Sequence, residues 1–225
     1  MTSGMPPTGP VVVLVHTQAA APAVLWAAEE CSRRGTELHL VTFGAAGSDR
    51  EADGASVLLQ QVSAAAAEHA PGVRIVTRAA PGPAAAGLIA ASGQAGQIVI
   101  AADGLTGDWS APDSTAWTVA AHSKCPVIIW RPTQNVALSA PVVVGLDGST
   151  VSTGALEFAL LQASWRRVPL VTVLAWSDVF LDADAQMLNV LTNWQKVVED
   201  YRRLLAQQLA GAQEQFPDVQ IERVL

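Results

Sequence analysis

The chain has 225 residues, half of them apolar and 15% charged, and its formal net charge is −7. This composition supplies a buried core for one large domain or two modest ones. No apolar run reaches the roughly 20 residues that span a bilayer, and no basic stretch precedes the first apolar run as it does in an export signal. We therefore expect a cytoplasmic protein with no membrane partner. Because no basic face is visible, we also expect no nucleic-acid partner.

Apolar runs alternate with segments of helical spacing through the first half of the chain. The alternation predicts right-handed strand–helix–strand units and a parallel sheet. Apolar runs predict strands at residues 11–15, 37–43, 73–78, 98–102 and 126–130. Helical spacing with proline and glycine stops predicts helices at residues 20–34, 49–69, 81 to 93 and 112–123.

The pattern restarts after a polar linker at Thr133–Ala140. Val142–Ser149 (VVVGLDGS) matches Val11–Gln18 (VVVLVHTQ), and a helix of similar length follows each segment. Further matching pieces follow in the same order, which indicates an internal repeat. They are a strand at Leu170–Trp176, a long helix near residues 183–213, and a last strand at Val219–Leu225.

We predict an α/β protein with two doubly wound parallel-sheet repeats of strand order 3-2-1-4-5, in domains 1–134 and 135–225. The second repeat has material for its first three strands only, so it is predicted to be incomplete. Val142–Leu146 would then be an exposed apolar edge, which invites pairing with another chain. We therefore expect a truncated chain, a processed fragment or an incomplete gene product. The alternative is a natural short protein that masks this edge in another way.

Several segments together resemble a tandem universal stress protein of the actinobacterial type. They are VVVGLDGS, ALEFAL, PLVTVLAWSD, PGPAAAGLIAAS and KCPVIIWRP, and the resemblance covers nearly the whole chain. It implies a small Rossmann-like domain, a role in the stress response, and ATP binding in many but not all members. It also implies a homo-oligomer, here through the strand Val127–Trp130, while the identity of other protein partners stays open.

In ATP-binding members of that family an aspartate after the first strand contacts the nucleotide. The second repeat keeps it as Asp147, followed by Gly148 and Ser149, whereas the first repeat has His16. A neutral histidine offers one donor and one acceptor, and it lacks the two-oxygen grip of a carboxylate. His16 is interpreted either as a modified ribose contact or as the end of a strand in a site that no longer binds.

The family's phosphate loop has three glycines in a fixed frame, which falls here on Ala101, Gly104, Ser114 and Thr115. Small residues preserve the frame, but two of the glycines are replaced. Residues 101–115 also contain three aspartates and no lysine or arginine. Each acid close to a phosphate costs on the order of 1 kcal/mol, so we expect weak or absent ATP binding in the first repeat, with Mg²⁺ only where ATP binds. Asp113 is interpreted alternatively as the N-cap of the following helix.

Two tryptophans, Trp109 and Trp117, flank this loop. Stacking on adenine is one interpretation, and packing in the core is the one we favour. The two cysteines, Cys31 and Cys125, lack metal-binding spacing, and no hydrolase or P-loop motif occurs, so we predict neither a metal site nor an enzyme.

The favoured hypothesis is therefore a stress-response binding protein with a degenerate first nucleotide site and an incomplete second one. One alternative is a stress protein that binds Mg-ATP or hydrolyses it weakly. The other is a dimerisation or scaffold module that binds no nucleotide.

Overall fold

The computed structural model describes residues 9–44, 49–101, 114–131, 139–147, 149, 152–174 and 209–224, with 199, 203, 206 and 207. The chain divides into two compact units, Met1–Gln134 and Asn135–Leu225. Each unit is described by itself below.

Unit 1 is built on a five-stranded parallel sheet of order β3-β2-β1-β4-β5. This is the fold class and strand order that the sequence predicts. Its strands are β1 (Val11–Leu14), β2 (Leu38–Gly44), β3 (Ile75–Pro81), β4 (Gln97–Ala101) and β5 (Val127–Trp130). Its helices are α1 (Ala21–Arg34), α2 (Asp49–His69), α3 (Ala84–Ala91) and α4 (Thr115–His122), with a short 3-10 turn, η1 (Gln18–Ala20), before α1.

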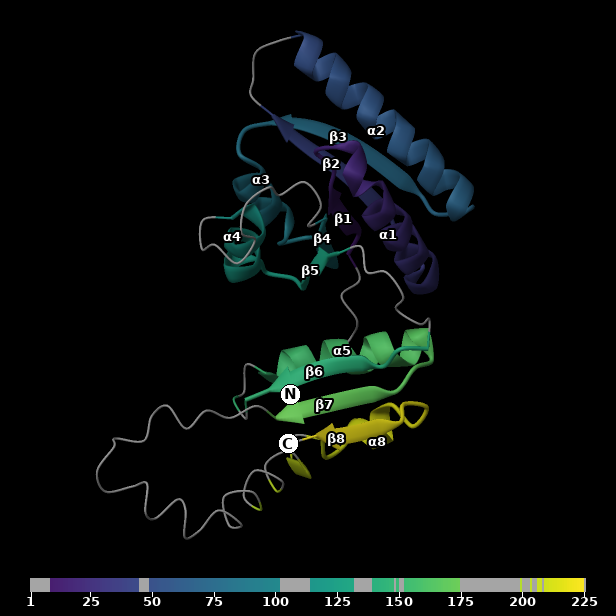
Figure 1. The fold of residues 1–225 in the computed structure, drawn as a ribbon, viewed down its shortest axis with the longest axis vertical. Coiled ribbons are helices and arrows are strands. Elements are labelled where there is room, and N and C mark those ends of the chain that lie inside the picture. Colours follow the sequence, from purple (N-terminus) through teal and green to yellow (C-terminus); the bar gives the residue numbers. More distant parts are fainter. Residues whose placement is uncertain are drawn as a thin grey trace, which may run out of the picture. The chain divides into compact units, whose positions relative to one another are not determined.

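The helices cover both faces of this sheet (Figure 1). Successive residues of a strand point to opposite faces, and the residues of β1 divide accordingly. Val11 and Val13 pack in a cluster with residues of α1 and α2. Val12 and Leu14 pack in another cluster with residues of α3 and α4. All of β1 is buried, as expected for a parallel strand with a continuous apolar run.

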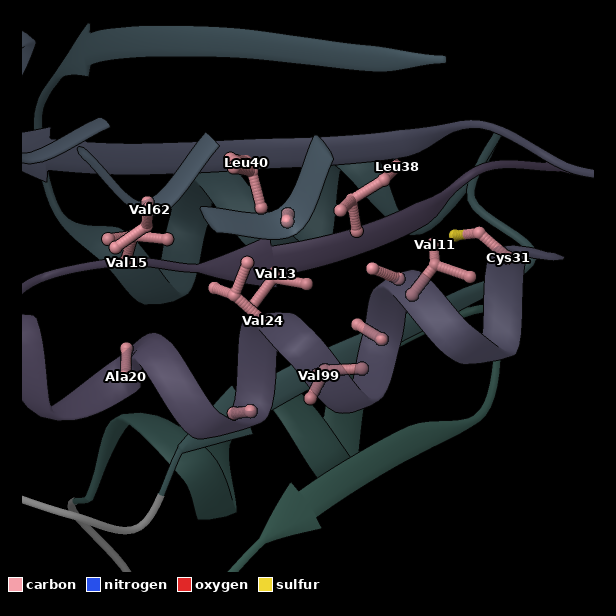
Figure 2. Close-up of a cluster of buried hydrophobic side chains, with 14 of the residues drawn as sticks. Val11, Val13, Val15, Ala20, Val24, Cys31, Leu38, Leu40, Val62 and Val99 are labelled. Carbon is pink, nitrogen blue, oxygen red and sulfur yellow. The ribbon is translucent and has the colours of Figure 1, made fainter. Parts of the chain in front are cut away.

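Figure 2 shows the cluster under α1 and α2. Val24 and Cys31 of α1 and Val62 of α2 lie over the valines of β1, and each is buried. The Cys31 thiol donates to the Glu37 carbonyl oxygen at 3.4 Å. Burial raises the pKa of Cys31 to about 12, so this cysteine is a structural apolar residue and not a nucleophile.

The boundary between β3 and α3 differs from the predicted one. β3 continues to Pro81, because its ladder with β2 runs to the pair Gly44 and Pro81. Proline is tolerated there because β3 is an edge strand. Helix α3 consequently begins at Ala84, after Pro83 in an extended conformation.

Unit 2 contains a three-stranded parallel sheet of order β6-β7-β8. Its elements are β6 (Val142–Leu146), α5 (Ser152–Arg166), β7 (Leu170–Leu174), α8 (Ala212–Gln215) and β8 (Ile221–Val224). Helix α5 covers one face, where Leu156 and Leu160 pack on Val144 and Leu170. The long helix predicted near residues 183–213 falls largely outside the described residues.

Both units contain the same set of backbone hydrogen bonds. These bonds define which residues of their first three strands and first helices are equivalent. In each unit the first strand bonds to the residue before the second strand, and the second strand bonds to the segment before the third. Val11 N to Glu37 O in unit 1 matches Val142 N to Pro169 O in unit 2, and Leu38 N to Arg74 O matches Leu170 N to Gln220 O. After the helix, Thr36 N to Cys31 O matches Val168 N to Ala163 O.

This match places Arg167 where unit 1 has Gly35. Gly35 ends α1 with φ 63°, and Arg167 follows α5 with φ 55°. The left-handed conformation suits glycine, because it has no Cβ, and costs other residues about 1 kcal/mol. The arginine pairs 33–34 and 166–167, which look equivalent in the sequence, are therefore offset by one residue.

Helix α3 approaches β2 closely at Gly87, and substitution there should destabilise unit 1. A Cβ at Gly87 would lie 2.0 Å from Cε1 of Phe43. We expect Gly87→Ala to lower the free energy of unfolding by about 1–3 kcal/mol, measured by urea titration. Gly54→Ala in α2, where a Cβ meets nothing within 4 Å, is the control and should stabilise by about 0.5–1 kcal/mol. Equal effects of the two substitutions would contradict the close approach.

Arg167→Gly should stabilise unit 2, because glycine relieves the left-handed backbone. We expect a gain of about 1 kcal/mol in the free energy of unfolding. Arg166→Gly, at the last residue of α5, is the matched control and should cost about 0.5–1 kcal/mol. Denaturant titration, monitored by hydrogen exchange of the Thr172 amide, reports on the stability of this unit. A loss of stability in Arg167→Gly would disprove the left-handed conformation assigned to Arg167.

Candidate functional site

The carboxyl ends of β1 and β4 meet at the point where the strand order of unit 1 reverses. The chain fills the sheet on one side of β1 through β3 and then crosses to β4 on the other side. Open α/β sheets bind ligands outside the carboxyl ends of their strands at such a switch point. The register pairs Leu14 with Ile100. His16, two residues after Leu14, and Ala101, the residue after Ile100, therefore lie at the same end of the sheet.

His16 has an unusual environment at this edge. Both of its ring nitrogens are buried, and neither has a hydrogen-bond partner in the part of the chain that the structure describes. A buried polar group without a partner costs about 1–3 kcal/mol. The imidazole therefore has one donor and one acceptor position left for a ligand or a water molecule.

The remaining predicted residues of unit 1 lie on β4 and α4. Ala101 is the last residue of β4 and is fully buried. Ser114 caps α4, since its hydroxyl accepts the Trp117 amide at 3.2 Å, and Thr115 is the first helical residue. Gly104 lies outside the described residues, as do Asp103, Asp108 and Trp109. The structure thus places both ends of the predicted phosphate loop and leaves its middle undescribed.

Three predictions about α4 are corrected. The helix begins at Thr115, not at Pro112, and its N-cap is Ser114, not Asp113. Trp117 is not a core residue, because 51% of its surface is exposed. The capping bond sets the orientation of the first helical turn. In this orientation Ala116 and Val119 face the core, and Trp117 points outward.

Asp147 occupies in unit 2 the position of His16, because Val142 and Val11 make equivalent hydrogen bonds. Its Oδ1 accepts the Ser149 amide at 2.9 Å. Hydrogen bonds from the Ser149 side chain, the Ser149 amide and the Ser152 side chain hold the pKa of this exposed carboxyl below its ordinary value. Asp147 therefore closes the turn between β6 and α5, and Gly148 lies outside the described residues.

Serine side chains complete this turn. The Ser152 amide donates to the Ser149 hydroxyl oxygen at 3.3 Å, and the Ser152 hydroxyl donates to the Ser149 carbonyl at 2.8 Å. The motif satisfies amides at the start of α5 that have no partner within the helix. Unit 2 thus has a carboxylate that local donors already engage, whereas the imidazole of unit 1 has no hydrogen-bond partner in the described ranges.

A hollow in unit 2 was not anticipated from the sequence. It has a volume of about 750 Å³ and lies where β7 and β8 begin, at the opposite end of the sheet from Asp147. Its lining residues come from separate segments of the sequence, so no local motif indicates the hollow. They are Ser164, Trp165, Arg167, Val168, Pro169, Asp218 and Gln220.

Within the described part of the chain, no cluster of histidine, cysteine, aspartate and glutamate side chains could hold a metal ion. A search of the same residues finds no helix with the length and apolar character needed to cross a membrane.

The family model "Universal stress protein family" matches residues 8–131. These residues contain the whole described part of unit 1, including the switch point and His16. The chain belongs to the universal stress protein family. Family membership agrees with the strand order and with the resemblance found in the sequence.

Two mycobacterial relatives are similar over a part of the chain. Universal stress protein Rv2623 of Mycobacterium tuberculosis is 38% identical over 107 residues, which are 46% of this chain and 34% of the relative. Universal stress protein Rv1996 of the same strain is 39% identical over 106 residues, which are 47% of this chain and 33% of the relative. The matched region thus spans about a third of the length of these relatives.

One solved structure is similar over nearly the entire chain. A universal stress protein from Archaeoglobus fulgidus matches with a TM-score of 0.64 and 15% identity, covering 96% of this chain and 76% of that one. At this identity the likeness concerns the fold, and its extent means that it includes elements of both units.

Replacing Ser149 should raise the pKa of Asp147, because its hydroxyl makes the largest contribution to the lowered value. We expect Ser149→Ala to move the carboxyl titration upward, as followed by NMR of the Asp147 side chain. The lowered pKa stabilises unit 2 above the ordinary carboxyl pKa, and this stabilisation is lost as pH falls through the lowered value. Ser164→Ala, whose hydroxyl donates to Asp218 at 2.7 Å, is the control and should leave Asp147 unchanged.

Proposed function

We propose that this chain is a stress-response regulatory protein that binds adenine nucleotides weakly at the switch point of unit 1. The observation that carries the proposal is His16, whose buried ring nitrogens have no hydrogen-bond partner among the described residues and which follows β1 at the switch point of a universal stress protein fold. The fold supplies the crevice, and the N-terminus of α4 supplies amides that favour an anion. The weak affinity follows from the residues that replace the expected carboxylate and glycines.

The chemistry of His16 limits how tightly a nucleotide is held. A carboxylate accepts hydrogen bonds from two hydroxyl groups and contributes charge, and hydrogen bonds to charged groups are worth about 1.5–3 kcal/mol. A neutral imidazole accepts only one hydrogen bond and has no charge. Residues 102–113 also contain aspartates, and their negative charge opposes the binding of phosphate groups.

We further propose that unit 2 is a second, partial universal stress protein repeat. The matched hydrogen bonds of the two units and the equivalence of His16 and Asp147 support this interpretation. Asp147 would have been the nucleotide contact of that repeat. The described part of unit 2 has no counterpart of β4 and α4, and Asp147 accepts a hydrogen bond from the Ser149 amide of its own turn.

The same proposal includes self-association and the absence of catalysis. Strand β5 (Val127–Trp130) is an edge strand with four half-buried apolar residues, and apolar edges favour pairing between copies. We propose a homo-oligomer through β5, in the cytoplasm. Because the sequence has no hydrolase or P-loop motif, we expect a magnesium-dependent assay of ATP turnover to give no activity above background.

Analysis of the purified chain for bound nucleotide tests the proposal. The protein is purified, denatured and assayed for released nucleotide, and then titrated with AMP and ATP with and without Mg²⁺. We expect little retained nucleotide and saturable binding with a dissociation constant above about 0.1 mM. Stoichiometric ATP on the purified protein would overturn the weak site, and no binding at millimolar nucleotide would overturn nucleotide recognition itself.

His16→Asp should tighten nucleotide binding, because the carboxylate restores a charged acceptor at the end of β1. We expect an affinity about tenfold higher, which corresponds to about 1.4 kcal/mol, measured by calorimetric titration with AMP. His16→Ala is the matched control, since it removes the imidazole without adding an acceptor, and it should not tighten binding. Similar gains in both variants would show that His16 obstructs the site sterically and does not face the nucleotide.

A further inference from the structure

The hollow of unit 2 is lined by two opposite charges that do not pair with each other. Arg167 and Asp218 both border it, and neither makes an ion pair with any residue that the structure describes. The Asp218 carboxylate accepts the Ser164 hydroxyl at Oδ2, at 2.7 Å. Its charge is therefore not balanced by a cation among those same residues. The hollow presents one cation and one anion to a molecule that enters it.

Unit 1 has neither charge at the equivalent positions. Arg167 stands where unit 1 has Gly35, as the matched hydrogen bonds establish. The turns before β3 and β8 share a backbone hydrogen bond between residues three apart, which places Asp218 where unit 1 has Gly72. Glycine at both positions suffices for the turns of unit 1. The two charged side chains are thus additions that the shared fold does not require.

The hollow lies where unit 1 has an ion pair. Arg74 Nη1 is 2.8 Å from Oε1 of Glu37 in unit 1, so these two charges neutralise each other. Unit 2 has Pro169 and Gln220 at the equivalent positions, and a proline ring offers no charge to a neighbour. The volume of about 750 Å³ lies within the range of about 300–1,000 Å³ that is typical of small-molecule sites.

Arg167 takes a backbone conformation that costs stability. Its φ is 55°, in the left-handed region that suits the glycine of unit 1. Conformations of this kind concentrate at ligand sites, where a function compensates for their cost. Arg167 also follows the last residue of α5, and the C-terminus of a helix favours cations. A strained arginine in place of a glycine, at the border of a hollow, indicates that its guanidinium binds a ligand.

We propose that the hollow binds a small zwitterion of the chemical class of an apolar α-amino acid. The guanidinium of Arg167 pairs with the carboxylate of the ligand, as arginine does in charge-assisted hydrogen bonds. Asp218 pairs with the ammonium group, and the surfaces of Trp165 and Pro169 contact the apolar side chain. A simple anion would be repelled by Asp218 and a simple cation by Arg167. The site belongs to unit 2 and is independent of the nucleotide site in unit 1.

Titration of the full chain with L-phenylalanine tests the proposal, monitored by NMR of the Val168 and Gln220 amides. We expect saturable shifts with a dissociation constant below about 1 mM. 3-Phenylpropionate lacks the ammonium group and phenethylamine lacks the carboxylate, so each should bind about tenfold more weakly or worse. AMP should leave these two amides unchanged, which separates this site from the nucleotide site. No saturable shift at millimolar L-phenylalanine, or equal binding of either analogue, would overturn the proposal.

Substitutions separate binding from folding. Arg167→Gly relieves the left-handed backbone while it removes the guanidinium, so it should weaken L-phenylalanine binding by about tenfold or more in a unit that is no less stable. Asp218→Asn keeps an oxygen for the Ser164 hydroxyl but removes the charge, and it should weaken L-phenylalanine and strengthen 3-phenylpropionate. Arg166→Ala removes a neighbouring cation that does not line the hollow and is the matched control, with unchanged affinities. Unchanged binding in Arg167→Gly or Asp218→Asn, or an equal loss in Arg166→Ala, would overturn the proposal.

Discussion

Strand β1 is a run of three valines and a leucine that is buried on both faces. Burial of such a strand requires a partner strand at each edge, because unpaired backbone groups away from water cost about as much as lost hydrogen bonds. It also requires helices on each face, because valine side chains alternate between them. The order of the strands, the two layers of helices and the position of the switch point in unit 1 all follow from completing β1.

The same completion creates the candidate site. Placing β4 beside β1 brings His16 and Ala101 to the same end of the sheet. Both ring nitrogens of His16 are buried there without a hydrogen-bond partner among the described residues. The surrounding sheet is held by the ladders of β1 with β2 and with β4. The site thus depends on the core for its geometry and on a single side chain for its chemistry.

Unit 2 repeats the hydrogen bonds of the first three strands. Among its described strands, β6 pairs with β7 alone, and Val143 is exposed. Asp147, at the equivalent of His16, turns back to the serines that cap α5. The carboxylate of Asp147 accepts hydrogen bonds from its own turn, because the nearest donors are the amides and hydroxyl groups there.

The sequence by itself determined the parallel α/β fold and the strand order of unit 1, because apolar runs, helical spacing and glycine or proline stops are local signals of burial. It also located His16 and Asp147 at equivalent strand ends. It did not determine that Pro81 belongs to a strand, that Ser114 and not Asp113 caps α4, or that Trp117 faces outward. Those outcomes depend on strand register and on competition between neighbouring caps. Only the tertiary structure decided that the nitrogens of His16 are buried, with no partner among the residues that the structure describes, and that Arg167 takes the place of a glycine. Burial and backbone conformation at a turn are set by residues distant in the chain.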